Sequence, residues 1–298
     1  MTYPTKVLLT GSTGLLGRAV LATAPGSYKV FPVFSKNPPL NLGYKFLQTD
    51  ITKKNEVNAI FEKVKPDVVI HAASIGNVDY CERNQEEAFK VNVTGTENLV
   101  KLCQKIGSRL VFISSNAVFD GFHPPYSETS QVAPVNCYGQ TKVAAEKIVS
   151  QSGLDFLIIR FTLMYGWNNS NQRSNAVTWL LDKLRRGEDV NLVTDTYVNP
   201  VFNLQAAECL WKALFLGKTG IYHVGGGERV NRYLLGLKTA QVFGFETSFI
   251  KPVTSDFFPG IAQRMPDTTF DTSQMQRELK IRPLKILTGL KIMRHISI

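Results

Sequence analysis

The chain has 298 residues, 44% hydrophobic and 19% charged, a composition typical of folded globular proteins that excludes intrinsic disorder. No apolar run is long enough to cross a bilayer, and the first residues carry no signal peptide, so we expect no membrane partner. The net charge of +10 is spread along the chain. This disfavours a nucleic-acid partner and would equally suit small molecules that carry phosphate.

The first half of the chain alternates short β-branched runs with longer helical patterns. The runs are almost continuously apolar, as in parallel strands covered on both faces, so we predict an α/β fold with a doubly wound (Rossmann) parallel sheet. The predicted strands are residues 6–10, 29–34, 44–49, 67–73, 109–115 and 155–161. The predicted helices between them are residues 15–24, 55–63, 82–106 and 138–152.

After residue 161 this alternation stops. Residues 164–175 resemble a loop, an amphipathic helix follows to about Arg186, and residues 220–227 contain one further strand. We therefore divide the chain into an NAD(P)-binding Rossmann domain and a smaller C-terminal substrate-binding lobe. The Rossmann domain comprises residues 1–163 and 190–224, and the lobe comprises residues 164–189 and 225–298.

A glycine triplet, Gly11, Gly14 and Gly17, lies between the first predicted strand and the first helix. In this position the three glycines permit a tight turn, a close approach to a pyrophosphate and close packing of the helix on the strand. The positive helix end then faces the anion, so we predict a dinucleotide site; a purely structural turn is the alternative. The predicted contacts in this loop are Gly11, Thr13, Gly14, Leu15, Leu16 and Gly17.

The end of the second predicted strand indicates which dinucleotide binds. It reads VFSKNPP, with Ser35 and Lys36 and no carboxylate that would hydrogen-bond an NAD ribose. A hydroxyl and an ammonium suit a 2′-phosphate, so NADP(H) is favoured over NAD(H), unless Lys36 is only a solvated loop residue. Asp50, with Ile51 beside it, follows the third predicted strand where a carboxylate could hold the adenine amino group.

Tyr138 and Lys142 lie one helical turn apart on the same predicted helix face. An ammonium about 5 Å from a phenol favours the phenolate by roughly 3 kcal/mol at an effective dielectric constant near 20, which predicts an acidic tyrosine. Ser114 and Ser115 offer a hydroxyl donor at the carboxyl end of the fifth predicted strand. This combination predicts a substrate carbonyl held by serine beside a nicotinamide and protonated by Tyr138.

The four cysteines and four histidines are dispersed, so we expect a reducing, cytoplasmic location and no metal site.

Residues 78–100, 114–147 and 160–166 together resemble the extended short-chain dehydrogenase/reductase superfamily, and within it the dTDP-4-dehydrorhamnose reductase family. The segments VFDG (118–121) and PPYSE (124–128), followed by Tyr138 and Lys142, carry most of this resemblance. It implies a catalytic triad of Ser115, Tyr138 and Lys142. Tyr138 would protonate the C4 keto oxygen of a nucleotide sugar while NADPH delivers hydride, as in dTDP-rhamnose synthesis.

The resemblance also assigns binding residues. Lys142 would hold the nicotinamide ribose, and the residues expected to line the cofactor channel are Ala72, Ala73, Ser74, Asn92 and Ser114. The substrate candidates are Asn116, Leu163, Asn175, Asn199 and Arg264, the last of which could alternatively form a surface ion pair. The chain departs from the family pattern with Asn116-Ala117 for Asp-Tyr, Leu163 for tryptophan, and Val198 and Val201 near the loop proline. These departures remove polar and aromatic sugar contacts.

The chain is also similar to the regulatory beta subunit of methionine adenosyltransferase, which binds NADP and attaches to an enzyme partner. That similarity gives a second hypothesis, an NADP-binding regulatory subunit; a sugar epimerase or a bifunctional epimerase/reductase is a third. The expected partner is a nucleotide sugar, with a homodimer also open, or an enzyme under the second hypothesis. Burial of Ile292, Met293 and Ile296 would favour the enzyme, and exposure would favour a partner-binding role.

Overall fold

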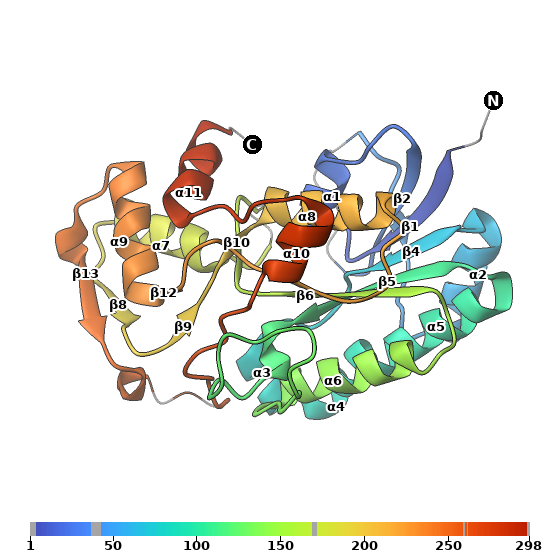
Figure 1. Ribbon diagram of the computed structural model, residues 1–298, viewed down its shortest axis with the longest axis horizontal. Coiled ribbons are helices and arrows are strands. Elements are labelled where there is room, and N and C mark those ends of the chain that lie inside the picture. Colours follow the sequence, from blue (N-terminus) through green and yellow to red (C-terminus); the bar gives the residue numbers. More distant parts are fainter. Residues whose placement is uncertain (1–3, 37–42, 169–171, 259, 261, 297–298) are drawn as a thin grey trace.

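The computed structural model describes residues 4–36, 43–168, 172–258, 260 and 262–296. These residues form a doubly wound α/β domain and a smaller lobe beside it, built mainly from the C-terminal part of the chain (Figure 1). The predicted fold class is confirmed.

The central sheet has seven parallel strands in the order β11-β6-β5-β4-β1-β2-β3. Their bounds are β1 Thr5–Thr10, β2 Tyr28–Phe34, β3 Leu47–Gln48, β4 Val68–His71, β5 Arg109–Ser115, β6 Phe156–Phe161 and β11 Gly220–Val224. The strand order reverses between β1 and β4, and ligands bind outside the carboxyl ends of the strands at such a reversal. The strands are short, and β1, β4, β5, β6 and β11 are mostly buried, as expected for a sheet covered on both faces.

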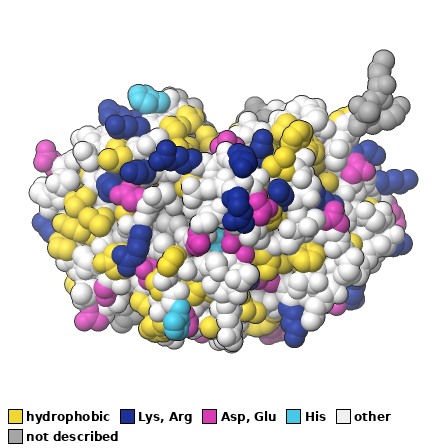
Figure 2. Space-filling model, in the orientation of Figure 1, with side chains coloured by type: hydrophobic (Ala, Val, Ile, Leu, Met, Phe, Trp, Pro, Cys, Tyr) yellow, Lys and Arg dark blue, Asp and Glu magenta, His cyan; other side chains and the backbone are white. Residues whose placement is uncertain are grey.

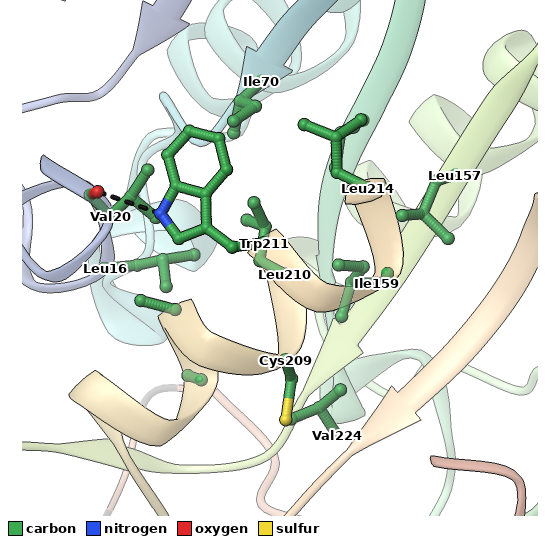
Figure 3. Packing of buried hydrophobic residues seen from close by; sticks show 14 of the residues in the cluster. Leu16, Val20, Ile70, Leu157, Ile159, Cys209, Leu210, Trp211, Leu214 and Val224 are labelled. Atoms are coloured by element: carbon green, nitrogen blue, oxygen red, sulfur yellow. Dashed lines mark hydrogen bonds between the residues drawn. The ribbon is translucent and has the colours of Figure 1, made fainter. Parts of the chain in front are cut away.

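Helices cover both faces of this sheet (Figure 1). One face packs against α1, α8 and α10, and the other against α2, α5 and α6. Their bounds are α1 Leu15–Ala22, α8 Asn203–Phe215, α10 Ser273–Leu279, α2 Lys54–Val64, α5 Gly95–Ile106 and α6 Cys137–Ser150. Figure 3 shows Trp211 of α8 packed among Leu16, Val20 and Ile70, with its indole donating a 3.1 Å hydrogen bond to the Val20 carbonyl. This packing fixes α1, and with it the glycine turn, against the sheet.

The smaller lobe has its own core. Residues of α7 (Ala176–Arg185), α9 (Arg232–Phe243) and α11 (Ile286–His295) pack around Tyr165 and Phe202. Three short strand pairs complete it, β7 with β10, β8 with β13 and β9 with β12. Their bounds are β7 Met164–Tyr165, β8 Val190–Val193, β9 Tyr197–Val198, β10 Val201–Phe202, β12 Val230–Asn231 and β13 Ile250–Val253.

Two predicted elements differ from the structure. The predicted strand 44–49 is reduced to the two residues of β3, at the edge of the sheet. The predicted helix 82–106 is divided into α3 (Val78–Arg83), α4 (Gln85–Phe89), a π-helical turn η1 (Lys90–Thr94) and α5. Asn84 breaks the first helix, and its side chain donates to the Tyr80 carbonyl, a local bond that competes with helix continuation.

Strand pairing also bears on the proposed domain boundary. Residues 190–193, assigned from sequence to the Rossmann domain, pair with β13 of the smaller lobe, so the chain returns to the main domain only with α8. Conversely, α10 packs on β11 and α8 of the main domain, although its residues were assigned to the lobe. Within the described residues, no helix has the length and apolar character needed to span a membrane.

Candidate active site

The glycine turn is closely packed on two sides and open on the third. Gly11 has φ +67°, and a Cβ there would lie 2.6 Å from the backbone of Ala72 and Ala73. A Cβ on Gly17 would lie 2.3 Å from the Gly11 carbonyl oxygen, so α1 can approach the turn only with glycine there. At Gly14, the exposed N-cap of α1, only the Gly11 carbonyl comes near, at 3.3 Å. The open side therefore lies where the helix N–H groups face outward, and it fits a phosphate.

The residues after β4 form one wall of this region. The Ala72 amide donates to the Thr10 carbonyl and the Ala73 amide to the Thr10 hydroxyl, while Ser74 is exposed. Asn92 belongs to η1, where it donates to the Ile75 carbonyl and the Thr141 hydroxyl and accepts from the Ile75 amide. Asn92 therefore holds the loop after β4 against α6, and this scaffolding role is what the structure shows for it.

Tyr138, Ser115 and Lys142 come together at the carboxyl end of β5. Ser115 is the last residue of β5, and its hydroxyl lies near enough to Tyr138 of α6 to lower the pKa of that phenol. The same hydroxyl donates a 3.3 Å hydrogen bond to the side-chain oxygen of Asn116. Lys142 is buried, donates a 3.0 Å hydrogen bond from Nζ to the Ile113 carbonyl and lies 5.9 Å from the centre of the Tyr138 ring. The helix reaches this position because Gly139 has no side chain: a Cβ there would lie 2.1 Å from the Ala117 carbonyl oxygen.

The predicted acidity of Tyr138 is not what the structure shows. Burial raises the pKa of Tyr138 to about 12, and the nearby Ser115 hydroxyl offsets this only in part. Burial also lowers the pKa of Lys142 to about 8, partly opposed by the Glu146 carboxylate. The spacing of the two residues reflects the attraction between their charges, but it does not reflect the free-energy cost of removing both charges from water. Tyr138 is therefore a neutral phenol at physiological pH, which is the form that can donate a proton.

Ser114 lies beside this group with its hydroxyl buried and without a partner among the described residues. A buried hydroxyl without a partner is costly, so this atom fits a polar ligand group. His71, under the same edge of the sheet, is held between the Thr10 and Thr96 hydroxyls at 2.9 and 3.0 Å. Burial and the nearby Lys142 lower the pKa of His71 to about 3, so it stays neutral.

Ser35, Lys36 and Asp50 line one cavity of about 840 Å³ beside β3 and α2. Lys36 is 84% exposed in its side chain and lies 3.7 Å from the Glu87 carboxylate. Asp50 accepts from both the amide and the hydroxyl of Thr52, and these bonds outweigh burial and lower its pKa. Ile51 is buried and does not line the cavity.

Two substrate candidates, Asn175 and Asn199, have structural partners for their side chains. Asn175 caps α7 by accepting from the Val177 and Thr178 amides, and it donates to the Gly166 carbonyl. Asn199 is buried, donates to the Gly226 and Phe270 carbonyls and accepts from the Phe270 amide. The sequence signal for the first was available, since Asn175 with Thr178 three residues later is a capping box.

Asn116, Leu163 and Arg264 lie nearer the boundary between domain and lobe. Asn116 follows Ser115 and donates a 2.6 Å hydrogen bond to the Thr268 hydroxyl, whereas Leu163 packs against the core of the smaller lobe. Arg264 forms a 2.7 Å ion pair with Asp79 of α3. The ion-pair alternative raised from the sequence is thus present, and it links lobe and domain.

Residues 262–268, here called the crossing segment, contact both parts of the molecule. On the domain side, Asp79 accepts from the Ala262 amide and Arg264, and Asn136 donates to the Gln263 carbonyl at 3.0 Å. On the lobe side, the Tyr197 amide donates to the Pro266 carbonyl at 2.8 Å. The crossing segment therefore sets the position of the lobe relative to the carboxyl ends of the strands.

A buried polar network that the sequence did not reveal supports the same edge. Arg160 of β6 forms a bidentate pair with Glu146 of α6, with N···O distances of 2.9 and 2.6 Å, and lies 3.2 Å from His223 of β11. His223 stacks on Phe270 with ring centres 4.0 Å apart. The Tyr126 carbonyl lies 3.0 Å from His223 Nδ1, and the Tyr126 ring stacks on Phe119 with ring centres 4.1 Å apart, so the PPYSE segment is part of this framework.

Among the described residues, no group of three or more His, Cys, Asp or Glu side chains could hold a metal ion. Figure 2 shows Lys and Arg side chains distributed among acidic ones over the visible face, rather than in one continuous basic patch.

Comparison with known proteins agrees with this arrangement. Residues 5–295 match the family model described as the RmlD substrate binding domain. The chain is 32% identical over 289 residues to the methionine adenosyltransferase 2 subunit beta of Xenopus laevis, covering 93% of this chain and 84% of that protein. It is 27% identical over 303 residues to the dTDP-4-dehydrorhamnose reductase of Aggregatibacter actinomycetemcomitans, covering 97% of this chain and 98% of the relative.

Among solved structures, the dTDP-4-dehydrorhamnose reductase of Bacillus anthracis in complex with NADP superimposes with a TM-score of 0.88 at 23% identity. The match covers 98% of this chain and 99% of that one. At this identity the likeness is one of fold.

Proposed function

Because the chain belongs to the RmlD substrate-binding domain family, we propose that it is an NADPH-dependent reductase of the 4-keto group of a nucleotide-activated deoxy sugar. The observation that carries the proposal is the neutral Tyr138 with the Ser115 hydroxyl and the buried Lys142 beside it, at the sheet edge next to the open glycine turn. The relative named as a dTDP-4-dehydrorhamnose reductase supports a dTDP-sugar, and thus a step in dTDP-rhamnose-type synthesis.

The residues divide the chemistry among them. When bound, the nicotinamide supplies a hydride to the carbonyl carbon. Ser115 would donate a hydrogen bond to the carbonyl oxygen, and Tyr138 would transfer its phenolic proton to that oxygen as negative charge develops. Lys142, fixed by the Ile113 carbonyl, would then favour the tyrosinate left behind, because its charge lies 5.9 Å from the ring.

The cofactor assignment follows from residues that fit it. The open side of Gly14 and the N-terminus of α1 suit the pyrophosphate, and the unpartnered Ser114 hydroxyl suits a polar group of the ligand. The chain that follows β2 brings a hydroxyl and an ammonium, Ser35 and Lys36, to the cavity beside β3 and α2 rather than a carboxylate, which supports NADP(H) over NAD(H). The four cysteines are free and buried, in keeping with the proposed cytoplasmic location.

The proposed function is tested by measuring turnover of a keto sugar. Purified protein given NADPH and a dTDP- or UDP-4-keto-6-deoxy sugar should oxidise the cofactor, followed by its absorbance, and should form the reduced sugar. No oxidation with any keto sugar would remove the reductase assignment.

A second function is favoured by the 32% identity to a methionine adenosyltransferase 2 subunit beta. Under it, the chain would bind NADP and an enzyme partner without reducing a sugar. The last helix does not favour one function over the other. Met293 is buried and Ile296 packs on the lobe core, as expected for the enzyme, whereas Ile292 is 37% exposed, as expected for a partner-binding role. Co-purification with a methionine adenosyltransferase catalytic subunit, together with inertness toward keto sugars, would establish this alternative.

A further inference from the structure

Arg232 is a partly buried cation with an unpartnered guanidinium nitrogen among the described residues. It is the first residue of α9, and its guanidinium Nη1 is shielded from solvent with no hydrogen-bond partner among the described residues. Arginine does not lose its proton near neutral pH, so the cost of burying this charge cannot be avoided by deprotonation. A buried donor of this kind normally has a partner, and its absence requires an explanation.

The surroundings of Arg232 make its charge less favourable still. Burial, and then the nearby Arg264 guanidinium, lower the pKa of Arg232 to about 10. The first turn of α9 contains no acidic residue, so the positive end of the helix dipole adds to the two guanidinium groups. Arg264 is balanced by Asp79 at 2.7 Å, whereas no described carboxylate pairs with Arg232.

The position of Arg232 is at the boundary between lobe and domain. Its neighbour Arg264 belongs to the crossing segment and reaches Asp79, near the start of α3. Helix α3 follows the loop after β4, whose backbone packs against the glycine turn. In Figure 1, α9 lies in the lobe and α3 in the domain, on the two sides joined by this ion pair.

We propose that Arg232 is an anion-binding residue of the substrate site and that its guanidinium receives a phosphate oxygen of the nucleoside diphosphate carried by the sugar. The inference rests on the proposed function and adds to it a residue that the sequence comparison did not suggest. A phosphate supplies the oxygen acceptors that Nη1 lacks and the negative charge that two arginines and a helix N-terminus would attract. The ligand would thus complete an interaction that the free protein leaves open.

This role and a structural role for Arg232 predict opposite effects on stability. Arg232→Met keeps the apolar stem and removes the unpaired charge. If Arg232 binds a ligand, the thermal midpoint of Arg232→Met without nucleotide should be higher than that of the wild type. If Arg232 has a structural role, the thermal midpoint of Arg232→Met should be lower than that of the wild type.

The experiment measures binding of dTDP, inorganic diphosphate and thymidine by calorimetry, with NADPH present. For Arg232→Met, the dissociation constant for dTDP and for diphosphate should rise about tenfold or more, the scale of one charge-assisted hydrogen bond. Thymidine and NADPH binding should be unchanged. The matched control is Arg186→Met, which makes the same change in net charge at an exposed arginine of the same lobe that pairs with Asp182. Arg232→Lys should recover part of the affinity.

The outcomes separate this inference from the reductase assignment. If the wild type binds dTDP and Arg232→Met binds it equally well, Arg232 has no such role, and the proposed function is untouched. A lower thermal midpoint for Arg232→Met, with loss of NADPH binding as well, would likewise overturn the inference by showing a structural role. If the wild type binds neither dTDP nor diphosphate, the inference is overturned, and keto-sugar turnover decides the proposed function separately.

Discussion

Two arginines, the buried Arg160 and the partly buried Arg232, occupy opposite electrostatic situations. Arg160 has a bidentate carboxylate, Glu146, and an imidazole, His223, within hydrogen-bond distance. Arg232 has another arginine as its neighbour, and its Nη1 has no partner among the described residues. A buried charge whose partners lie in the protein contributes to the fold, whereas an unpartnered donor requires an explanation, and for Arg232 we propose a ligand.

Two tyrosines show the same contrast. The Tyr126 hydroxyl accepts from the Gly121 and His123 amides and donates to Asp120 at 2.6 Å. For Tyr138, by contrast, the pKa reflects burial first, then the nearby Ser115 hydroxyl and last the Cys81 thiol. We therefore assign the region around Arg160 and Tyr126 to the framework and propose the region around Tyr138 and Arg232 as the ligand site.

The largest expected effect tests this division at the tyrosines. Tyr138→Phe should lower the rate of keto-sugar reduction by about 10²–10⁴-fold, because the proton donor is removed, while NADPH affinity and the free energy of unfolding stay near wild type. Tyr126→Phe is the matched control. It should lower the free energy of unfolding by about 1–3 kcal/mol, because it leaves amides unpaired, and keep the turnover of the folded protein. A fully active Tyr138→Phe would remove the tyrosine from the mechanism.

The second test concerns the framework arginine. Arg160→Met should lower the free energy of unfolding by about 3–5 kcal/mol in urea titrations, because Glu146 is left buried and unpaired. Adding Glu146→Leu should restore much of this loss, since the lone charge is then gone. Arg160→Met with unchanged stability would mean that the network does not support the fold, and the contrast with Arg232 would fail.

The third test uses pH. The pKa of Lys142 is about 8 in the folded protein against a usual value of 10.5. Below pH 8 both folded and unfolded lysine are charged and the burial penalty is fully present. Between pH 8 and 10.5 only the unfolded lysine keeps its proton, so this group makes stability rise with pH by up to about 3 kcal/mol.

Lys142→Met isolates that contribution from other groups that titrate in the same range. The difference in unfolding free energy between variant and wild type should favour the variant most at pH 7 and shrink toward pH 10. A difference that does not change with pH would show that Lys142 is not desolvated in the folded state.

The smallest effect concerns cofactor choice. Lys36→Ala should weaken NADPH binding about five- to tenfold without changing NADH binding, the scale of about 1 kcal/mol for an exposed ion pair. Lys54→Ala, at the exposed start of α2 and outside the cavity that Lys36 lines, is the matched control. Equal losses for both cofactors would show that Lys36 does not read the 2′-phosphate.

The sequence predicted what depends on periodicity and on backbone requirements. The alternating pattern led to the parallel sheet, and the spacing of Gly11, Gly14 and Gly17 led to a turn in which two of the three positions exclude a Cβ. Both features are local, so a single chain contains the signal for them.

The sequence predicted poorly what depends on neighbours distant in the chain. The pKa of Tyr138 was misjudged because the degree of burial is set by the whole fold, not by the lysine four residues away. Asn199 was proposed for substrate, yet its partners are Gly226 and Phe270, from parts of the chain that no local pattern connects to it. Arg232 carried no motif at all, and its unpartnered guanidinium nitrogen becomes visible only in the folded structure.

The crossing segment, residues 262–268, has a consequence for how the molecule could be altered. The hydrophobic interiors of domain and lobe are built from residues outside this segment. A backbone cut or an insertion near Met265 should therefore leave both hydrophobic cores folded. The proposed sites for the nucleotide sugar and the hydride donor should then no longer be aligned with each other. Folding of the two cores and the proposed catalysis are thus separable in this chain, and residues 262–268 are where an alteration should affect the second without the first.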